Sequence, residues 1–402
     1  MRRLIQNYTI VAAVFYLLAG SYAVAKTDNN TGIAKETSSS KNLGPNLKAT
    51  KFYYLIDADT KEVLLSKNAD DEISPSSMTK VMTAYVALDE IEKGNLSFDS
   101  QCVVGMDAWR KSGSTMFLNH GDVVTIRKLI RGLLSVSGND AAVALAQSSA
   151  KGGFDDFIDL MNDKARELGM KNSHFENPHG LYEEEHYMSV RDLGTLAVNF
   201  CQNFPQYLHL LRIPEFTYGN ITQRNRNPLM KREYEGTVGG KTGHTNDGGY
   251  GVVGIVKRDH RRLVGVINKA RTPNQRSSAI IELFDYGFKN FKKVVLFKKG
   301  QNVAKLNVWL GDKRKVGVVT NQKVAFTIPR NQSLDEVTVK VNYLGPFYPT
   351  IKKGDKIANL MIKVDGYKTL KYPLFAQENI SKASYFSRVN QILRYKISHF
   401  LL

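Results

Sequence analysis

The hydrophobic pattern of the chain changes from mixed to purely strand-like, and this change divides it into two parts of different fold class. Between residues 51 and 291, strand-like runs at both ends flank a central stretch whose apolar residues recur at helical spacing. From Val294 to about Phe375, short β-rich runs alternate with Gly, Pro, Asn and Asp turns. The pattern predicts an α+β domain over residues 48–292, followed by a small all-β domain over residues 293–377.

The last 25 residues, 378–402, return to helical spacing. An apolar set recurs there, and basic residues interrupt it, so the segment is too polar to span a bilayer. We expect an amphipathic helix that lies in the membrane interface with its cations toward anionic head groups. The alternative is a helix that packs on a core. The apolar residues are Phe386, Val389, Ile392, Leu393, Ile397, Phe400 and Leu401, and the basic ones are Lys382, Arg388, Arg394 and Lys396.

The N-terminus has the pattern of a cleaved secretory signal. Arg2 and Arg3 precede an apolar run, and Ala23-Val24-Ala25 forms a small-x-small site, which predicts a signal peptide over residues 1–25. Residues 26–47 are polar and low in complexity, which predicts a disordered spacer. An uncleaved signal anchor is the alternative, and export follows in either case.

Two cysteines are too few for a disulfide framework or a four-cysteine zinc site. In an oxidising compartment Cys102 and Cys201 could pair, but their separation along the chain carries no geometric information, so pairing stays open.

The net charge of +18 is concentrated at one end of the chain. Residues 289–402 contain 22 Lys and Arg against 6 Asp and Glu, whereas residues 26–288 contain 32 of each kind. An enzyme that acts on nucleic acid should be basic around its catalytic region, because neutralisation of phosphates dominates such binding. The sequence therefore predicts no nucleic-acid partner.

Ser77-Met78-Thr79-Lys80 places a serine and a lysine one turn apart near the start of a predicted helix over residues 77–92. A lysine whose pKa is lowered by burial or by a neighbouring cation can deprotonate a serine hydroxyl. The motif alone is weak, since Ser38 and Lys41 share the spacing, and Ser77 could equally be a helix N-cap.

Two further polar motifs follow in the chain. Ser137-Gly138-Asn139 lies in a predicted turn between helices, where a hydroxyl and an amide could relay a proton and hold a carbonyl, although a turn with an N-cap explains it as well. Lys241-Thr242-Gly243-His244 closes a predicted strand. There the glycine permits close approach of a substrate backbone, and the lysine and threonine can bind a carboxylate, whereas an exposed turn is the alternative.

The order and spacing of the three motifs resemble those of penicillin-binding proteins and serine β-lactamases. The flanking sequences SPSSMTKVMT, LLSVSGNDAAVALA and GGKTGHTNDGGY are most similar to the D-alanyl-D-alanine carboxypeptidases among the low-molecular-mass penicillin-binding proteins. The resemblance covers the chain from the signal to the C-terminal helix. It implies a transpeptidase-like (β-lactamase-like) catalytic domain, a small β domain and a C-terminal amphipathic anchor. Lys61 departs from the family, which usually has glycine in the first hairpin turn.

The resemblance also implies roles for individual residues. Ser77 would be the nucleophile, Lys80 its base, and Ser137 the relay of a proton to the leaving group. The remaining residues would bind substrate: Asn139, Lys241, Thr242, Gly243, His244 and Arg276, with the backbone N–H groups of Ser77 and His244 as the oxyanion hole. Arg271 is close enough in sequence to compete with Arg276 for its role, and Asp192 matches a family position but could be a capping or ion-pair residue.

The implied function is that of a serine carboxypeptidase on the periplasmic face of the inner membrane, which removes the terminal D-alanine from a peptidoglycan pentapeptide. It would need no metal or organic cofactor and would be acylated by β-lactam antibiotics. A D,D-endopeptidase is the near alternative. A β-lactamase would need the Glu-x-x-Leu-Asn loop, which is absent between residues 150 and 210. A non-catalytic cell-wall scaffold would leave the three intact motifs unexplained.

Overall fold

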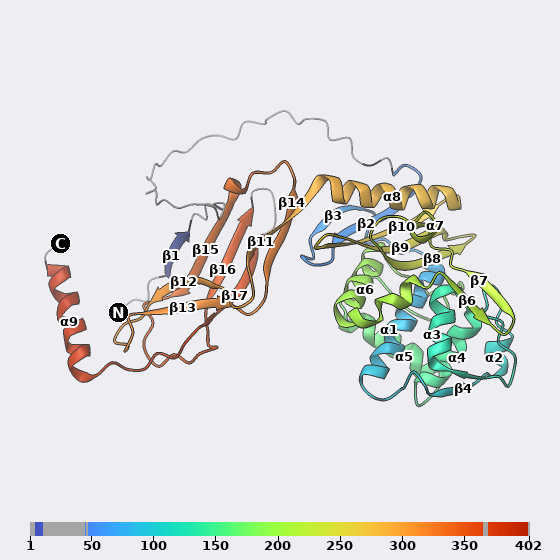
Figure 1. The fold of residues 1–402 in the computed structure, drawn as a ribbon, viewed down its shortest axis with the longest axis horizontal. Coiled ribbons are helices and arrows are strands. Elements are labelled where there is room, and N and C mark those ends of the chain that lie inside the picture. Colours follow the sequence, from blue (N-terminus) through green and yellow to red (C-terminus); the bar gives the residue numbers. More distant parts are fainter. Residues whose placement is uncertain (1–4, 11–44, 46, 365–368, 401–402) are drawn as a thin grey trace. The chain divides into compact units, whose positions relative to one another are not determined.

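The computed structural model describes residues 5–10, 45, 47–364 and 369–400 (Figure 1). The chain forms two compact units, which divide between Phe291 and Lys292. The predicted signal cleavage after Ala25 and nearly all of the predicted spacer lie outside the described residues. Within the predicted signal peptide, Ile5–Ile10 is described as strand β1 and pairs with β15 of the second unit.

The first unit contains a five-stranded antiparallel sheet that joins the two ends of its sequence. The strand order is β3-β2-β10-β9-β8, so the hairpin at the start of this unit lies directly beside the hairpin near its end. The strands are β2 (Phe52–Asp57), β3 (Val63–Lys67), β8 (Thr237–Thr245), β9 (Gly249–Arg258) and β10 (Arg261–Ala270). In the first hairpin Lys61 has a φ of 60°, a left-handed conformation that glycine adopts without strain.

Apolar side chains cover both faces of this sheet, so its inner strands are buried from two sides. Helix α8 (Pro273–Asn290) and the short α7 (Pro228–Lys231) pack on one face, through Ile280, Phe284 and Leu229. The helical insert between β3 and β8 packs on the other, where Tyr54 and Val266 join a core made mostly of helix residues.

The central stretch with helical spacing folds as the helical insert between β3 and β8. The predicted helix over residues 77–92 begins instead as the 3₁₀ turn η1 (Ser76–Thr79), and α-helical hydrogen bonding starts with α1 (Lys80–Glu92). The further helices are α2 (Met106–Trp109), α3 (Ile126–Ser135), α4 (Asn139–Ser149), α5 (Phe154–Glu167), α6 (Val190–Asn203) and η2 (Pro205–Arg212). Two small hairpins, β4 (Gln101–Val103) with β5 (Val123–Thr125) and β6 (Glu215–Tyr218) with β7 (Ile221–Arg224), complete it. Cys102 and Cys201 are both buried and free, so the pairing left open by the sequence is not formed.

The second unit is the predicted all-β domain. Its main sheet has the order β1-β15-β16-β17-β13-β12, and β11 pairs separately with β14. The strands are β11 (Phe291–Phe297), β12 (Asn302–Asn307), β13 (Lys315–Thr320), β14 (Val324–Pro329), β15 (Val337–Leu344), β16 (Lys356–Val364) and β17 (Leu370–Ala376), with the 3₁₀ turn η3 (Leu334–Glu336) before β15. Alternate residues of β15, among them Val339 and Val341, are buried, which is the period-2 pattern of a sheet with one covered face.

The C-terminal helix α9 (Tyr385–Phe400) contacts the β domain along one side only. Gln391 donates to the Gly311 carbonyl at 3.2 Å and accepts from the Leu310 N–H at 3.1 Å, and the ring of Tyr395 lies edge-on to Trp309. Its apolar residues stay exposed, with 83% of Phe386, 53% of Leu393 and 57% of Ile397 accessible. The helix therefore contacts the β domain through Gln391 and Tyr395, whereas these apolar side chains do not pack on its core. In the described part of the chain, no helix has the length and apolarity needed to cross a membrane.

Candidate active site

The first predicted motif lies on a tight turn at the edge of the sheet. Ser77 belongs to η1, half-buried, and Lys80 is the first residue of α1, with an exposed fraction of 0%. The predicted one-turn spacing brings Lys80 Nζ within 3.0 Å of Ser77 Oγ. Ser77 makes no helix-capping hydrogen bond, and the residue before it, Ser76, has a φ of 51°. The hydroxyl of Ser77 is thus available to the lysine rather than used as a cap.

Three oxygen atoms surround the Lys80 amine. Besides Ser77 Oγ, they are Asn139 Oδ1 at 2.7 Å and the His179 carbonyl at 2.6 Å. The amide and carbonyl oxygens can only accept, so they take two N–H bonds. A neutral lysine amine has two N–H groups and one lone pair, and the lone pair is then left to face Ser77 Oγ. This is the arrangement of a base that accepts the serine proton.

The electrostatics favour that neutral form. Burial lowers the pKa of Lys80 well below its ordinary value, and the nearby positive charge of Lys241 lowers it further, whereas Asp140 acts in the opposite direction. Because Lys80 has no exposed surface, water does not compensate for the buried charge.

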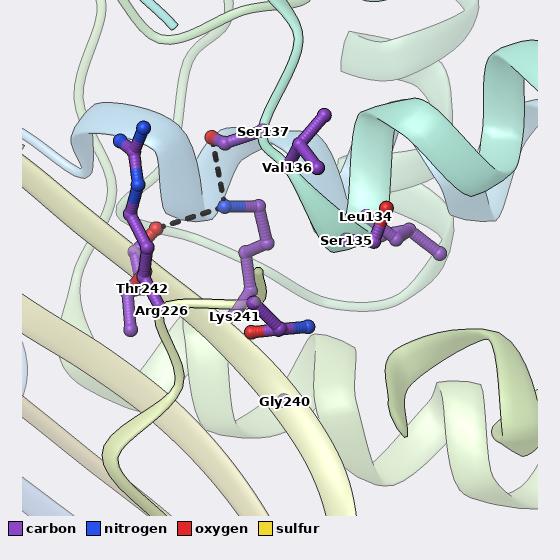
Figure 2. Close-up of a pocket in the computed structure, with 9 residues that line it drawn as sticks. Leu134, Ser135, Val136, Ser137, Arg226, Gly240, Lys241 and Thr242 are labelled. Atoms are coloured by element: carbon purple, nitrogen blue, oxygen red, sulfur yellow. Dashed lines mark hydrogen bonds between the residues drawn. The ribbon is translucent and has the colours of Figure 1, made fainter. Parts of the chain in front are cut away.

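The second and third motifs meet in a small pocket shown in Figure 2, lined by Leu134–Ser137, Asn225, Arg226 and Gly240–Thr242. Lys241 Nζ lies 2.9 Å from Ser137 Oγ and 3.0 Å from the carbonyl oxygen of Thr242, the next residue in the chain. Burial, with the charges of Arg226 and Arg276, lowers the pKa of Lys241 to about 7. Ser137 has a φ of 69°, in the connection between α3 and α4, so its hydroxyl is presented by the backbone turn that the sequence predicts.

Asn139 joins the first two motifs. Its Oδ1 accepts from Lys80, its Nδ2 donates to the Ser112 carbonyl at 2.7 Å, and its backbone N–H donates to the Ser114 carbonyl at 2.7 Å. With 3% of its surface exposed, it is fixed by partners on both sides. The geometry is that of a group that positions Lys80.

The third motif lies on β8, an edge strand that passes close to the nucleophile turn. A Cβ at Gly243 would lie 2.7 Å from the Pro75 carbonyl oxygen, so glycine is needed for this approach. Thr242 is half-buried, and the exposed His244 stacks on Tyr250 with ring centroids 3.9 Å apart. Burial, followed by the charge of Arg276, lowers the pKa of His244.

Of the two competing arginines, the structure brings Arg276 to the site. Its guanidinium lies 5.7 Å from the ring centroid of Tyr250, and burial lowers its pKa. Its buried Nε has no hydrogen-bond partner within the described residues. Arg271 is exposed. Arg276 therefore brings a buried N–H without a partner close to Lys241, where an anion can bind.

The structure adds groups that the sequence did not indicate. The loop over residues 177–181 supplies the His179 carbonyl to Lys80, and a Cβ at Gly180 would lie 1.9 Å from the Ser76 carbonyl oxygen. Behind the loop, His186 accepts from the Glu176 N–H at 3.1 Å, so its other ring nitrogen carries the proton donated to Thr79 Oγ1 at 2.9 Å. These contacts use backbone atoms and a distant histidine, which no local motif identifies.

Asp192 has a structural role, as the alternative interpretation held. Its Oδ2 accepts from the N–H of Asn172 and the hydroxyl of Ser173, both at 2.8 Å, and its own N–H bonds to the capping Ser189 of α6. Burial raises its pKa. None of these partners belongs to the site.

A serine that faces a buried lysine, with a second lysine on an edge strand bonded to a second serine, defines the class of serine hydrolases that use lysine as base. Residues 36–272 match the family model described as D-alanyl-D-alanine carboxypeptidase, and residues 291–382 match that of the penicillin-binding protein 5 C-terminal domain. The chain belongs to the D-alanyl-D-alanine carboxypeptidase family.

Its relatives resemble it over nearly their whole length. The D-alanyl-D-alanine carboxypeptidase DacF of Bacillus subtilis is 30% identical over 96% of this chain and 97% of its own. DacA of Escherichia coli is 32% identical over 86% of this chain and 87% of its own. The crystal structure of penicillin binding protein 5 from Haemophilus influenzae superposes with a TM-score of 0.77 at 29% identity, over 83% of this chain and 98% of that one. The predicted family and fold class are thereby confirmed.

The loop that holds Lys80 allows a test with a matched control. Gly180 and Gly169 both have positive φ, 81° and 74°, but a Cβ at Gly169 meets nothing within 4 Å. We expect Gly180→Ala to slow acylation of the enzyme by penicillin at least about tenfold, because the turn that carries Ser77 must shift. Gly169→Ala should cost about 1 kcal/mol of stability and leave acylation unchanged. Equal acylation rates in stopped-flow measurements of the two variants would contradict this account of the loop.

The link between the two lysines can be tested through the pH dependence of acylation. If Lys80 is the base, acylation needs its neutral form, so the rate should rise as pH increases through the lowered pKa of that amine. In Lys241→Gln one cation that lowers this pKa is gone, so the rising limb should move to higher pH. Lys257 is exposed, so Lys257→Gln serves as the control for loss of one positive charge elsewhere on the protein. If the rising limb of the acylation rate in Lys241→Gln stays at the same pH, or moves to lower pH, Lys241 does not lower the pKa of Lys80.

Proposed function

We propose that this protein removes the terminal D-alanine from peptidoglycan pentapeptides through an acyl-enzyme on Ser77. The observation that carries the proposal is the Lys80 amine, held by two acceptors and lying 3.0 Å from Ser77 Oγ. Family membership supplies the substrate class, since its curated relatives are named D-alanyl-D-alanine carboxypeptidases.

Acylation would proceed by transfer of the Ser77 proton to Lys80 as Ser77 Oγ bonds to the carbonyl carbon of the penultimate D-alanine. The negative charge that develops on the carbonyl oxygen would be stabilised by the backbone N–H groups of Ser77 and His244. When the C–N bond breaks, Ser137 would relay a proton to the amine of the departing D-alanine. Water then hydrolyses the ester and restores the serine hydroxyl, which completes a cycle without a cofactor.

The terminal carboxylate of the substrate would bind the positive groups on and beside β8. Lys241 and Thr242 lie on that strand, and Arg276 reaches the site from α8. Gly243 has no Cβ, which allows the close approach of the Pro75 carbonyl. It would likewise let the substrate backbone lie along the strand edge. A substrate without a free terminal carboxylate would lose these charge-assisted contacts.

A β-lactam presents the same groups, a reactive amide and a carboxylate, and would acylate Ser77 in the same way. Its leaving group stays attached to the acyl chain and can block the approach of water. The sequence lacks the glutamate loop that activates this water in β-lactamases. The penicilloyl ester should therefore persist far longer than the peptidyl ester.

The proposed location is the periplasmic face of the inner membrane. Export is supported by the signal-like N-terminus, and attachment by α9, whose exposed apolar residues point away from the side fixed by Gln391. Basic residues on the helix, among them Arg394 and Lys396, suit anionic lipid head groups. The helix would lie on the surface of the membrane.

The nucleophile can be identified with labelled penicillin. Wild-type protein and Ser38→Ala should become labelled with one equivalent and release D-alanine from a pentapeptide, whereas Ser77→Ala should do neither. Ser38 is a suitable control because it has the same spacing to Lys41. Label retained by Ser77→Ala in mass spectrometry would contradict the assignment. Cleavage of a cross-linked dimer into two peptides, without release of D-alanine from the free pentapeptide, would instead favour the endopeptidase.

The anchor can be tested with two single substitutions of equal charge. Leu393→Glu places a carboxylate on the exposed apolar side of α9, and Ser387→Glu places one outside it. We expect the first to reduce binding to vesicles that contain anionic lipid by about tenfold or more, and the second to reduce it by at most about threefold. Both should retain full hydrolysis of a soluble pentapeptide. Equal binding in a sedimentation assay would show that this side of the helix does not contact lipid.

A further inference from the structure

The tip of the β8–β9 hairpin rests directly on the turn that carries the nucleophile. A Cβ at Gly248 would lie 3.0 Å from the Ser74 carbonyl oxygen and 3.1 Å from Ser76 Oγ. A Cβ at Gly243 would lie 3.1 Å from the Cβ of Ser76. The two glycines therefore show that the hairpin and the turn touch without intervening side chains. The hairpin carries His244 and the turn carries Ser77, so this contact joins the two proposed oxyanion-hole donors.

A hydroxyl–hydroxyl hydrogen bond crosses the contact. Ser76 Oγ lies 3.1 Å from Thr245 Oγ1, and the residues are 169 positions apart in sequence. Thr245 Oγ1 also accepts from the Gly248 N–H at 2.9 Å. Each partner is the direct chain neighbour of a proposed oxyanion-hole residue: Ser76 precedes Ser77, and Thr245 follows His244.

The backbone at Ser76 shows that this position is constrained. Its φ of 51° lies in the left-handed region, which is unfavourable for a residue with a Cβ, and only 2% of its surface is exposed. A residue held in such a conformation needs surrounding contacts that fix it. The bond to Thr245 is one of these contacts, and it leaves the turn in the orientation that directs Ser77 to Lys80.

We propose that the Ser76–Thr245 hydrogen bond is a positioning device that sets the separation of the two oxyanion-hole N–H groups. The proposal rests on the proposed function, because it assumes that the N–H groups of Ser77 and His244 stabilise the oxyanion. Neither Ser76 nor Thr245 needs to touch the reacting atoms. Their bond holds the turn against β8 while the carbonyl carbon changes from planar to tetrahedral.

Such a device acts on the transition state more than on substrate binding. Oxyanion-hole donors must lie about 2.7–3.1 Å from the oxyanion, and loss of a whole donor costs about 10²–10³ in rate. Loss of the bond would loosen the spacing without removing a donor. We therefore expect Ser76→Ala and Thr245→Val each to lower kcat of pentapeptide hydrolysis by about tenfold with little change in KM.

The experiment combines both variants with their double mutant. Ser76→Ala removes only the shared bond, whereas Thr245→Val also removes the bond from the Gly248 N–H. The double mutant should therefore be no slower than Thr245→Val alone. Thr245→Ser keeps the hydroxyl and should restore most of the rate. Thr217→Val is the matched control, since it removes an exposed hydroxyl–hydroxyl bond of 2.8 Å to Thr222, and neither residue lines the pocket.

A transition-state analogue separates positioning from general loss of structure. The affinity of a peptide boronic acid, which forms a tetrahedral adduct with serine, should fall by the same factor as kcat/KM in Ser76→Ala. Partial unfolding would lower the number of titratable sites and leave that affinity unchanged. Wild-type kcat in Ser76→Ala, independent effects in the double mutant, or unchanged boronate affinity would each overturn the proposal. A wild-type protein that neither hydrolyses pentapeptide nor reacts with penicillin would instead overturn the proposed function.

Discussion

The burial of the Lys80 amine is the constraint on which the rest of the site depends. A charged ammonium in this position would lack water and would lie near Lys241, so its neutral form is favoured. The two acceptors beside it, on Asn139 and His179, occupy its N–H groups and direct its lone pair at Ser77. The same arrangement thus keeps the Lys80 amine neutral and directs its lone pair at Ser77.

That arrangement requires four distant segments to converge. The nucleophile turn, the α3–α4 connection, the loop at His179 and the edge strand β8 each contribute one or two groups. Their close approach depends on missing side chains: Gly180 meets the Ser76 carbonyl and Gly243 meets the Pro75 carbonyl. The sheet and the helical insert serve to hold these segments at contact distance. The insert lies between β3 and β8 in the sequence and packs on one face of the sheet that these strands share.

Much of this could be predicted from the sequence, because the chemistry is concentrated in short motifs. The spacing of Ser77 and Lys80 on one helical turn predicts their proximity, and the hydrophobic periods predict a helical stretch between strand-like ends and a separate β domain. Choosing between Arg276 and Arg271 required the structure, which buries only the first.

Other parts of the site leave no local signal. The carbonyl of His179 reaches Lys80 from 99 positions away, and a backbone oxygen has no sequence signature. The 3₁₀ turn at Ser76 replaces the first turn of the predicted helix because contacts with β8 override local propensity. Free, buried Cys102 and Cys201 likewise depend on the tertiary fold, which places each of them in the helical core.

The central claim, that Lys80 is a neutral base in the resting enzyme, is most directly tested by NMR of the protein labelled with ¹³C at lysine Cε. The Lys80 signal can be assigned by its loss in Lys80→Arg, and its chemical shift reports the charge of the amine as pH is varied. We predict that Lys80 is already neutral where the exposed lysines are still fully charged, and that Lys241 titrates at a pKa of about 7. A Lys80 signal that titrates together with the exposed lysines would contradict the account.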